Sequence, residues 1–532
     1  MNPVEVKRKQ IQMYSHIIGV ITLLAVGRII QDAGVAYLAA AVECYFGVCL
    51  LISYGAADCL GKILRSRNGK GQNKNCAGLR KNAMLLQGAV GVAGSILLSA
   101  CAGPLAEHVF ELPYSSLLIR LFAPAVFLRT ISSVLLGYFQ GEGSELPTAA
   151  ACVIRQVFIL GFSLLFCNIL KSYGEKVSGL LGREEFTFMW AGSGAAIAVS
   201  LTEILILLFL LLVYRGSSKE RKKAEEGKKT RESLWDFTRI LYGSMGAFLL
   251  TGLLERLPVW FGMVFFHKNA QGADLGGQSY GVYYGQYLAL CAGFLFLLCA
   301  SLIPAGARVT HGLKREDQRY ARNCFQAGIH MIWAKALFFA VFLAVMAQQT
   351  AGIFNEARAE TLASMLRFGS SIIVFGAFAF YFKSILLSQG KKYHVAACLG
   401  IANVIFAAAS ALFLQAGNAG ILSLVYGGVI GSALYCGLTG FFVIGRLGRG
   451  IQMVRTFCIP LGAVCGAALM EFLIGEFFTP HLGNVAAALI GFGVSFAVYW
   501  GILLALRNFK VQELAAVQGG RLLKLFVKAV GK

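Results

Sequence analysis

Long apolar runs, separated by short polar segments, repeat along almost the whole chain of 532 residues. Most runs are long enough to cross the hydrocarbon core of a bilayer as a helix, which takes about 20 residues. Their apolar positions are continuous rather than alternating, which favours helices over a membrane β-barrel. The pattern predicts an all-α polytopic membrane protein with about fourteen transmembrane helices.

The expected spans fall into two groups of six, followed by two more. They cover residues 11–30, 36–59, 83–103, 116–136, 148–170, 189–214, 240–266, 283–305, 325–348, 363–387, 395–415, 421–445, 457–475 and 484–506. We therefore expect an N-lobe at 1–214, a basic cytoplasmic linker at 215–239, a C-lobe at 240–445, and two additional helices with a basic tail at 446–532.

The two lobes are weakly similar in sequence. Gly34-Val35-Ala36-Tyr37 opens the second span, and Gly281-Val282-Tyr283-Tyr284 opens the eighth. Because six is an even number, two six-helix copies insert in the same orientation, with a pseudo-two-fold axis along the membrane normal. Transporters place their substrate site between such halves, so the sequence predicts a central cavity.

Composition and charge support this topology. The chain is 57% hydrophobic and 14% charged, with a formal net charge of +22. With the N-terminus inside, 35 of the 48 basic residues fall in inside segments and 5 in outside segments. This asymmetry predicts that both termini are cytoplasmic. Topology and anionic membrane lipid explain the positive charge, so no nucleic-acid partner is expected.

No enzyme signature, nucleotide-binding motif or zinc-type cysteine spacing occurs, so the sequence predicts a protein that is not an enzyme and has no cofactor. Candidate chemistry lies instead in charged residues within the spans. Glu255-Arg256-Leu257-Pro258 places two opposite charges and a proline in the seventh span. A charge at this depth costs several kcal/mol unless it is paired or faces water, so we expect this segment to line the cavity.

Further charged residues lie in other spans. The residues expected to bind substrate are Arg28, Glu43, Glu255, Arg256 and Arg308, and those expected to serve as coupling or structural charges are Asp58, Arg129, Arg155 and Glu203. Alternative interpretations remain open for some of them. Arg308 could extend to the interface, Arg129 and Arg155 could support the loop between their spans, and Glu203 could be a protonated packing residue.

Arginine side chains favour an anionic substrate, because a guanidinium group stays charged and binds phosphate through two hydrogen bonds. An exporter of cationic drugs would instead be expected to present unpaired carboxylates. The carboxylates of this chain are also candidates for binding a coupling Na⁺ or H⁺, and the sequence does not choose between these roles.

One segment resembles a known family. Leu136-Gly137-Tyr138-Phe139-Gln140-Gly141, followed by Leu146-Pro147-Thr148-Ala149, is similar to a turn motif of the MurJ and stage V sporulation protein B branch of the multidrug/oligosaccharidyl-lipid/polysaccharide exporter superfamily. We expect a tight glycine-bounded turn here, with the proline opening the next helix. Where the family motif begins with arginine, this chain has Leu136, and Glu255-Arg256 replaces a more neutral pattern.

The resemblance implies a two-lobed flippase with alternating access in the bacterial cytoplasmic membrane. The implied substrate is an undecaprenyl-pyrophosphate-linked sugar, such as lipid II or a polysaccharide repeat unit, and cell-envelope synthesis enzymes are the implied protein partners. It also implies that Arg28, and with it Arg308, faces the cavity. The alternatives are an ion-coupled multidrug antiporter of the same architecture and a scaffold that does not transport.

Overall fold

The structure is a computed structural model that describes residues 3–216, 233–269, 277–416, 419–448 and 451–509. Within these ranges the regular structure is entirely helical, which confirms the predicted all-α fold. Eleven helices of the described part are long and apolar enough to cross a membrane, or twelve when the bent pair Ala359–Gly369 and Ile372–Ser388 is taken as one span. The chain is therefore a multi-pass membrane protein.

The predicted number of fourteen spans is not confirmed and stays a prediction. Two of the apolar stretches, Pro3–Asn68 and Val454–Ala505, each cover two of the spans expected from the sequence. Helix α1 (Pro3–Ser53) contains a residue with non-helical backbone angles at Gln31, and α17 (Ile459–Ala505) contains one at Gly483. Both breaks lie where the sequence predicts a loop between neighbouring spans.

The chain divides into two compact units, which we call the N-unit (Ile21–Gly285) and the C-unit (Met1–Val20 with Gln286–Lys532). Helix α8 (Leu234–Asn269), which contains the predicted seventh span, belongs to the N-unit together with the second half of the first span and the whole of the second to sixth spans. The predicted lobe boundaries and their pseudo-symmetry stay predictions. Most of the predicted linker lies outside the described residues, and its last part, from Leu234, is helical.

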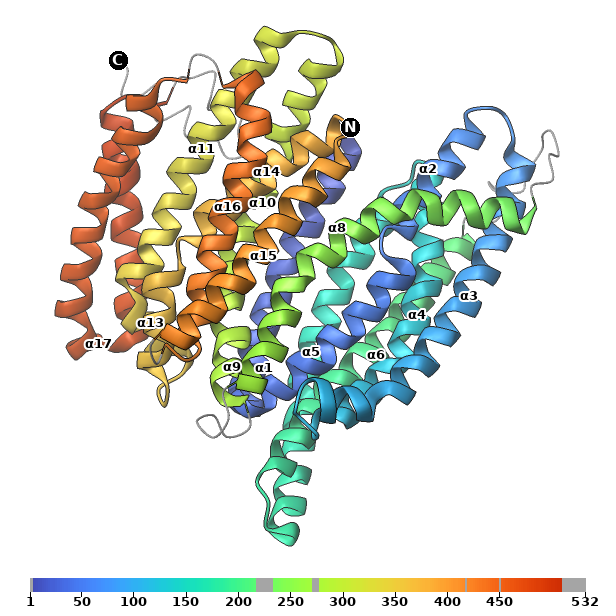
Figure 1. Ribbon diagram of the computed structural model, residues 1–532, viewed down its shortest axis with the longest axis horizontal. Helices are drawn as coiled ribbons and strands as arrows, with labels where there is room; N and C mark the ends of the chain where they lie inside the picture. The colour runs from blue at the N-terminus through green and yellow to red at the C-terminus, as the bar shows by residue number, and fades with distance from the viewer. Residues whose placement is uncertain (1–2, 217–232, 270–276, 417–418, 449–450, 510–532) are drawn as a thin grey trace. The chain divides into compact units, whose positions relative to one another are not determined.

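The N-unit is built from helices that pack along one another. After α1 they are α2 (Ala56–Asn68), α3 (Asn73–Pro104), η1 (Leu105–Val109), α4 (Ser115–Gly141), α5 (Leu146–Leu181), α6 (Glu185–Gly216), α8, α9 (Gln278–Val282) and the beginning of η3 (Tyr283–Leu288). Helices α5 and α6 form a long hairpin whose closed end extends beyond the neighbouring helices of this unit (Figure 1). Both helices are longer than the spans predicted at 148–170 and 189–214.

The first part of α8 packs on the ends of α2, α3, α4 and α6. Phe237, Leu241 and Met245 of α8 are buried in one apolar cluster with Leu64 and Leu210. Burying side chains of this size stabilises a contact by roughly 1.5–3 kcal/mol each. This cluster positions the remainder of α8, and with it Arg256, against α1.

The glycines of the family-like motif serve a helix crossing rather than a turn. Gly137 and Gly141 lie inside α4, and the turn begins only at Glu142, so the predicted turn position is wrong. A Cβ atom on Gly137 would lie 2.9 Å from the carbonyl oxygen of Ala57, and one on Gly141 would lie 2.6 Å from Cβ of Leu64. The motif therefore allows the backbones of α4 and α2 to approach closely.

We predict that Gly137→Ala lowers the stability of the protein by about 1–3 kcal/mol, because the added methyl group overpacks this crossing. Gly179→Ala is a matched control, since Gly179 lies in α5 with no atom within 4 Å of the added Cβ. Thermal unfolding in detergent, followed by loss of the monodisperse chromatographic peak, measures both. Equal unfolding temperatures for the two variants would contradict the role assigned to Gly137.

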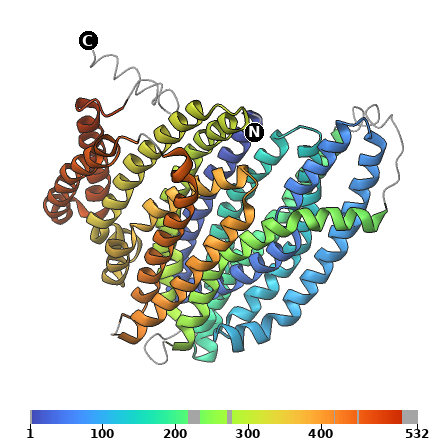
Figure 2. The same cartoon turned by 45° about the horizontal axis from the view of Figure 1, so that its top comes forward.

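The C-unit contains the second set of helices. Besides the start of α1, they are the rest of η3, α10 (Ala289–Lys314), α11 (Gln318–Val345), α12 (Ala347–Phe354), α13 (Ala359–Gly369), α14 (Ile372–Ser388), α15 (Lys392–Ala416), α16 (Leu422–Leu447), η4 (Val454–Cys458) and α17. Helices α15 and α16 lie side by side in both views (Figure 2). Helix α17 packs on α11, where the Tyr499 hydroxyl donates a 2.7 Å hydrogen bond to the carbonyl oxygen of Ala334.

Candidate functional site

A buried carboxylate, Glu43, is the centre of a polar cluster in the N-unit. Its Oε1 accepts hydrogen bonds from Nη1 of Arg256 and from the hydroxyl of Tyr284, each at 3.0 Å. Its Oε2 accepts one from the indole Nε1 of Trp260 at 2.9 Å. The Glu43 side chain is fully buried, with no exposed surface. Three donors therefore compensate a carboxylate charge that would otherwise be very costly at this depth.

Local sequence features bring these donors to Glu43. Arg256 and Trp260 are four residues apart on α8 and so lie on one face of that helix. Tyr284 comes from η3, a π-helical segment, and such segments often occur at functional sites. Gly47 lies one turn after Glu43 on α1, and a Cβ atom there would come within 3.3 Å of the Trp260 ring. The absence of a side chain at Gly47 lets the indole approach α1.

Arg256 is held on one side and open on the other. Its guanidinium group lies 4.9 Å from the ring centre of Phe46, and 38% of its side chain is exposed. Among the described residues, Arg256 donates a single hydrogen bond, to Glu43. The remaining N–H groups are available to water or to an anion. The sequence could not settle which carboxylate pairs with which arginine. The structure pairs Arg256 with Glu43 rather than with the adjacent Glu255.

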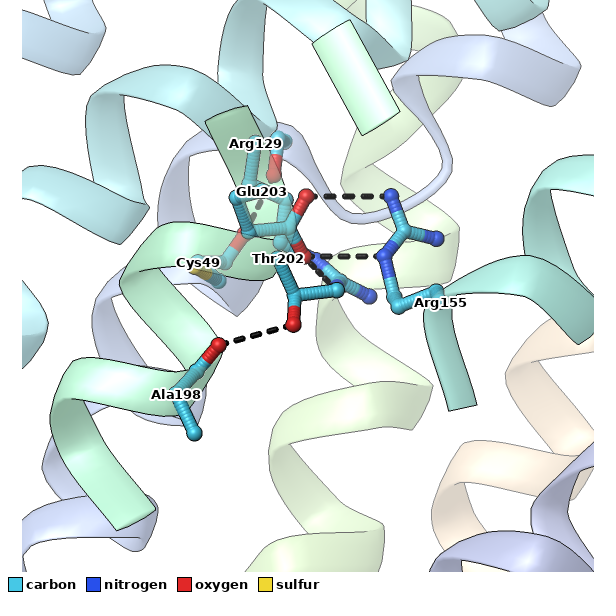
Figure 3. A network of polar contacts seen from close by, with 7 residues as sticks. Cys49, Arg129, Arg155, Ala198, Thr202 and Glu203 are labelled. Carbon is cyan, nitrogen blue, oxygen red and sulfur yellow. Dashed lines mark hydrogen bonds and ion pairs between the residues drawn. The ribbon is translucent and has the colours of Figure 1, made fainter. Parts of the chain in front are cut away.

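A second polar cluster in the N-unit joins three helices (Figure 3). Nε and Nη2 of Arg155 on α5 donate to Oε1 and Oε2 of Glu203 on α6, at 2.9 and 3.1 Å. Nη1 of Arg129 on α4 donates to Oε1 of the same carboxylate at 3.0 Å. We call these residues the 129–155–203 triad. The interpretation of Glu203 as a protonated packing residue is therefore wrong, and the two arginines pair with Glu203 rather than supporting a loop.

Two other residues expected at the site also lie in the N-unit, outside these two clusters. Arg28 is exposed on α1, three residues before the break at Gln31. Asp58 is in the first turn of α2, where a negative charge is favoured by the helix dipole. Glu255 is exposed on α8 and points to a different side from Arg256, because consecutive helical residues are about 100° apart.

Arg308 lies in the C-unit and lines a narrow crevice between α10 and α11. Lys335 lines the same crevice, and the other residues around it are small or apolar apart from Ser301 and Cys324. Both cations are partly buried. The lining carries two positive charges and no carboxylate, so the crevice favours an anion.

Several residues that place polar groups inside the structure were not expected from the sequence. Trp260 and Tyr284 are ordinary aromatic residues within apolar spans, and only their contact with Glu43 distinguishes them. Glu471 on α17 is fully buried, and its presence inside a predicted span could have identified it. Within the described ranges, no group of three or more His, Cys, Asp or Glu residues is arranged to hold a metal ion.

Comparison with known proteins gives consistent similarities. The family described as "Polysaccharide biosynthesis protein" matches residues 10–309. Stage V sporulation protein B of Bacillus subtilis is 23% identical over 238 residues, which are 44% of this chain and 43% of that protein. The chain thus matches less than half the length of this curated relative.

Solved structures show the same fold. An inward-facing multidrug resistance MATE family transporter of the MOP superfamily matches with a TM-score of 0.62 at 15% identity, covering 84% of this chain and 98% of that one. A MOP superfamily transporter from Pyrococcus furiosus, described as having a binding pocket of reversed polarity, matches with a TM-score of 0.57 at 16% identity, covering 84% and 98%. The chain therefore has the fold of this transporter superfamily.

Proposed function

Because the chain belongs to the polysaccharide biosynthesis protein family and has a MOP-superfamily transporter fold, we propose that it is a flippase for an undecaprenyl-pyrophosphate-linked sugar. The substrate would be lipid II or a polysaccharide repeat unit. The proposed site of action is the bacterial cytoplasmic membrane, with both termini in the cytoplasm. The implied protein partners are the enzymes that make and polymerise the glycan on either side of that membrane.

The observation that carries this proposal is the arrangement around Arg256. Glu43 is buried and fixes one edge of the guanidinium group, while 38% of the Arg256 side chain remains exposed. A guanidinium group held in this way is oriented before the ligand arrives, so little side-chain entropy is lost on binding. Its remaining donors suit the oxygens of a phosphate or pyrophosphate.

We assign to Arg256 the pyrophosphate of the lipid-linked sugar, and to Arg28 of the same unit a second contact with it. Trp260 and Tyr284 would hold Glu43 and so keep Arg256 in position. Glu255 and Arg308 stay predicted substrate contacts. Transport would proceed by alternating access, and an ion gradient or the membrane potential would supply the driving force through Na⁺ or H⁺.

The proposal is tested by reconstituting the purified protein in liposomes that contain a fluorescent undecaprenyl-pyrophosphate-linked sugar. A membrane-impermeant reductant destroys the dye in the outer leaflet, so a second, slower phase of loss reports flipping. A parallel sample measures uptake of a cationic dye. Liposomes without protein and liposomes with a denatured preparation are the controls.

We expect flipping of the lipid-linked sugar and no uptake of the cationic dye. Uptake of the dye without flipping would instead support a multidrug antiporter. If neither occurs although the protein is folded in the liposomes, the flippase proposal is wrong and a scaffold role is favoured.

A further inference from the structure

The 129–155–203 triad carries more positive than negative charge. Two guanidinium groups share one carboxylate, which leaves one positive charge uncompensated. All three residues lie within helices long and apolar enough to cross the membrane, where an uncompensated charge costs several kcal/mol. A balanced pair would need only Arg155, whose two hydrogen bonds already occupy both oxygens of Glu203.

The uncompensated charge is located on Arg129. Of the three side chains, Glu203 is 1% exposed and Arg155 is 9% exposed, whereas Arg129 is 34% exposed. Within the described part of the chain, Arg129 donates a single hydrogen bond, to Glu203. Several of its N–H groups therefore remain open on the accessible side of the triad.

A buried hydroxyl group lies beside this charge. Tyr45 on α1 is 3% exposed, and its hydroxyl has no hydrogen-bond partner among the described residues. The Tyr45 ring stacks on Phe122 of α4, with ring centres 5.2 Å apart, and Phe122 lies two turns before Arg129 on the same face of that helix. A buried hydroxyl without a partner is unfavourable, so a ligand that accepts its hydrogen bond would be favoured.

We propose that Arg129 and the Tyr45 hydroxyl, next to the Arg155–Glu203 pair, form a binding site for one small monovalent anion of the halide type. A single negative charge makes the triad electrically neutral, whereas phosphate would overcompensate it. Such an ion accepts hydrogen bonds from the open N–H groups of Arg129 and from Tyr45. The site is distinct from the Glu43–Arg256 cluster and does not depend on the identity of the transported lipid.

The test is binding of radioactive chloride to the purified wild-type protein in chloride-free gluconate buffer, with phosphate and bromide as competitors. We expect saturable binding of about one chloride per chain, displaced by bromide and not by the same concentration of phosphate. Arg129→Gln removes only the uncompensated charge and leaves the Arg155–Glu203 pair, so it should fold and bind at least tenfold more weakly. Lys176→Gln, an exposed change on α5, is the charge-matched control.

Two further variants make the result independent of how Arg129→Gln folds. Arg129→Lys keeps the charge and should retain chloride binding, while Tyr45→Phe removes one donor and should weaken binding several-fold. Absence of saturable chloride binding in the wild type, or unchanged binding in both Arg129→Gln and Tyr45→Phe, would overturn the proposal. Displacement by phosphate in preference to bromide would also overturn it and indicate a phosphate-bearing ligand.

Discussion

Replacing Arg256 with methionine should reduce flipping of the lipid-linked sugar about 100-fold, which corresponds to about 2.7 kcal/mol of lost interaction. The change removes the charged donors that we assign to the pyrophosphate. It also leaves the carboxylate of Glu43 buried without its ion-pair partner, and breaking such a pair costs about 3–5 kcal/mol of stability. The measurement is the initial flipping rate in liposomes at equal amounts of folded protein.

A second variant separates the two effects of this change. The double replacement Glu43→Gln with Arg256→Met removes both charges, while the glutamine oxygen, in the place of Oε2, can still accept from Trp260 and its NH2 group can donate to the hydroxyl of Tyr284. We expect it to recover folded abundance but not transport. Recovery of transport in the double variant would show that Arg256 acts only as the partner of Glu43, and the assignment of Arg256 to the substrate would be withdrawn. Arg319→Gln, an exposed change on α11, is the charge control.

Replacing Glu203 with glutamine should destabilise the protein by about 3–5 kcal/mol, because two guanidinium groups would then share no negative charge inside the membrane. Membrane abundance should fall several-fold, and the unfolding temperature in detergent should decrease. Glu175→Gln, on the exposed part of α5, changes the same residue type and should alter stability by no more than about 0.5 kcal/mol.

The double variant Glu203→Gln with Arg129→Gln identifies the cause of this loss. It returns the triad to the same net charge as the wild type, so it should recover much of the stability if charge repulsion dominates. No recovery would show instead that the hydrogen bonds of Glu203 to Arg155 and Arg129 matter more than the net charge. The size of the recovery is the coupling energy between the two positions.

Much of the fold follows from the order of residues along the chain. The length of each apolar segment and the basic residues that flank it reflect how that segment meets the membrane. This is a local property, which can be read from the segment itself. The sequence therefore predicted a helical multi-pass protein and located its apolar helices, although α3 begins well before its predicted span and α5 ends well after its own. The sequence predicted the local structure less well at positions where packing against a neighbouring helix determines that structure. Gly137 and Gly141 were assigned to a turn, yet they lie inside α4 because α2 crosses there.

The family resemblance was also available from the sequence, and the match over residues 10–309 confirms it. The charged residues within the spans could be identified individually, because each is conspicuous against an apolar background. Their partners could not. Trp260, Tyr284 and Tyr45 are common residue types in membrane helices, and nothing in their immediate sequence marks them as members of a polar cluster.

The sequence by itself thus determined the helical class, the membrane location of the chain and the set of intramembrane charges. Only the tertiary structure decided which of these charges meet. Glu43 and Arg256 are 213 positions apart, and Arg129 and Glu203 are 74 apart. Ion pairing at such separations depends on which helix faces pack together. That packing is set by contacts such as the α2–α4 crossing and the apolar cluster in which the first part of α8 is buried. These contacts involve several helices at once.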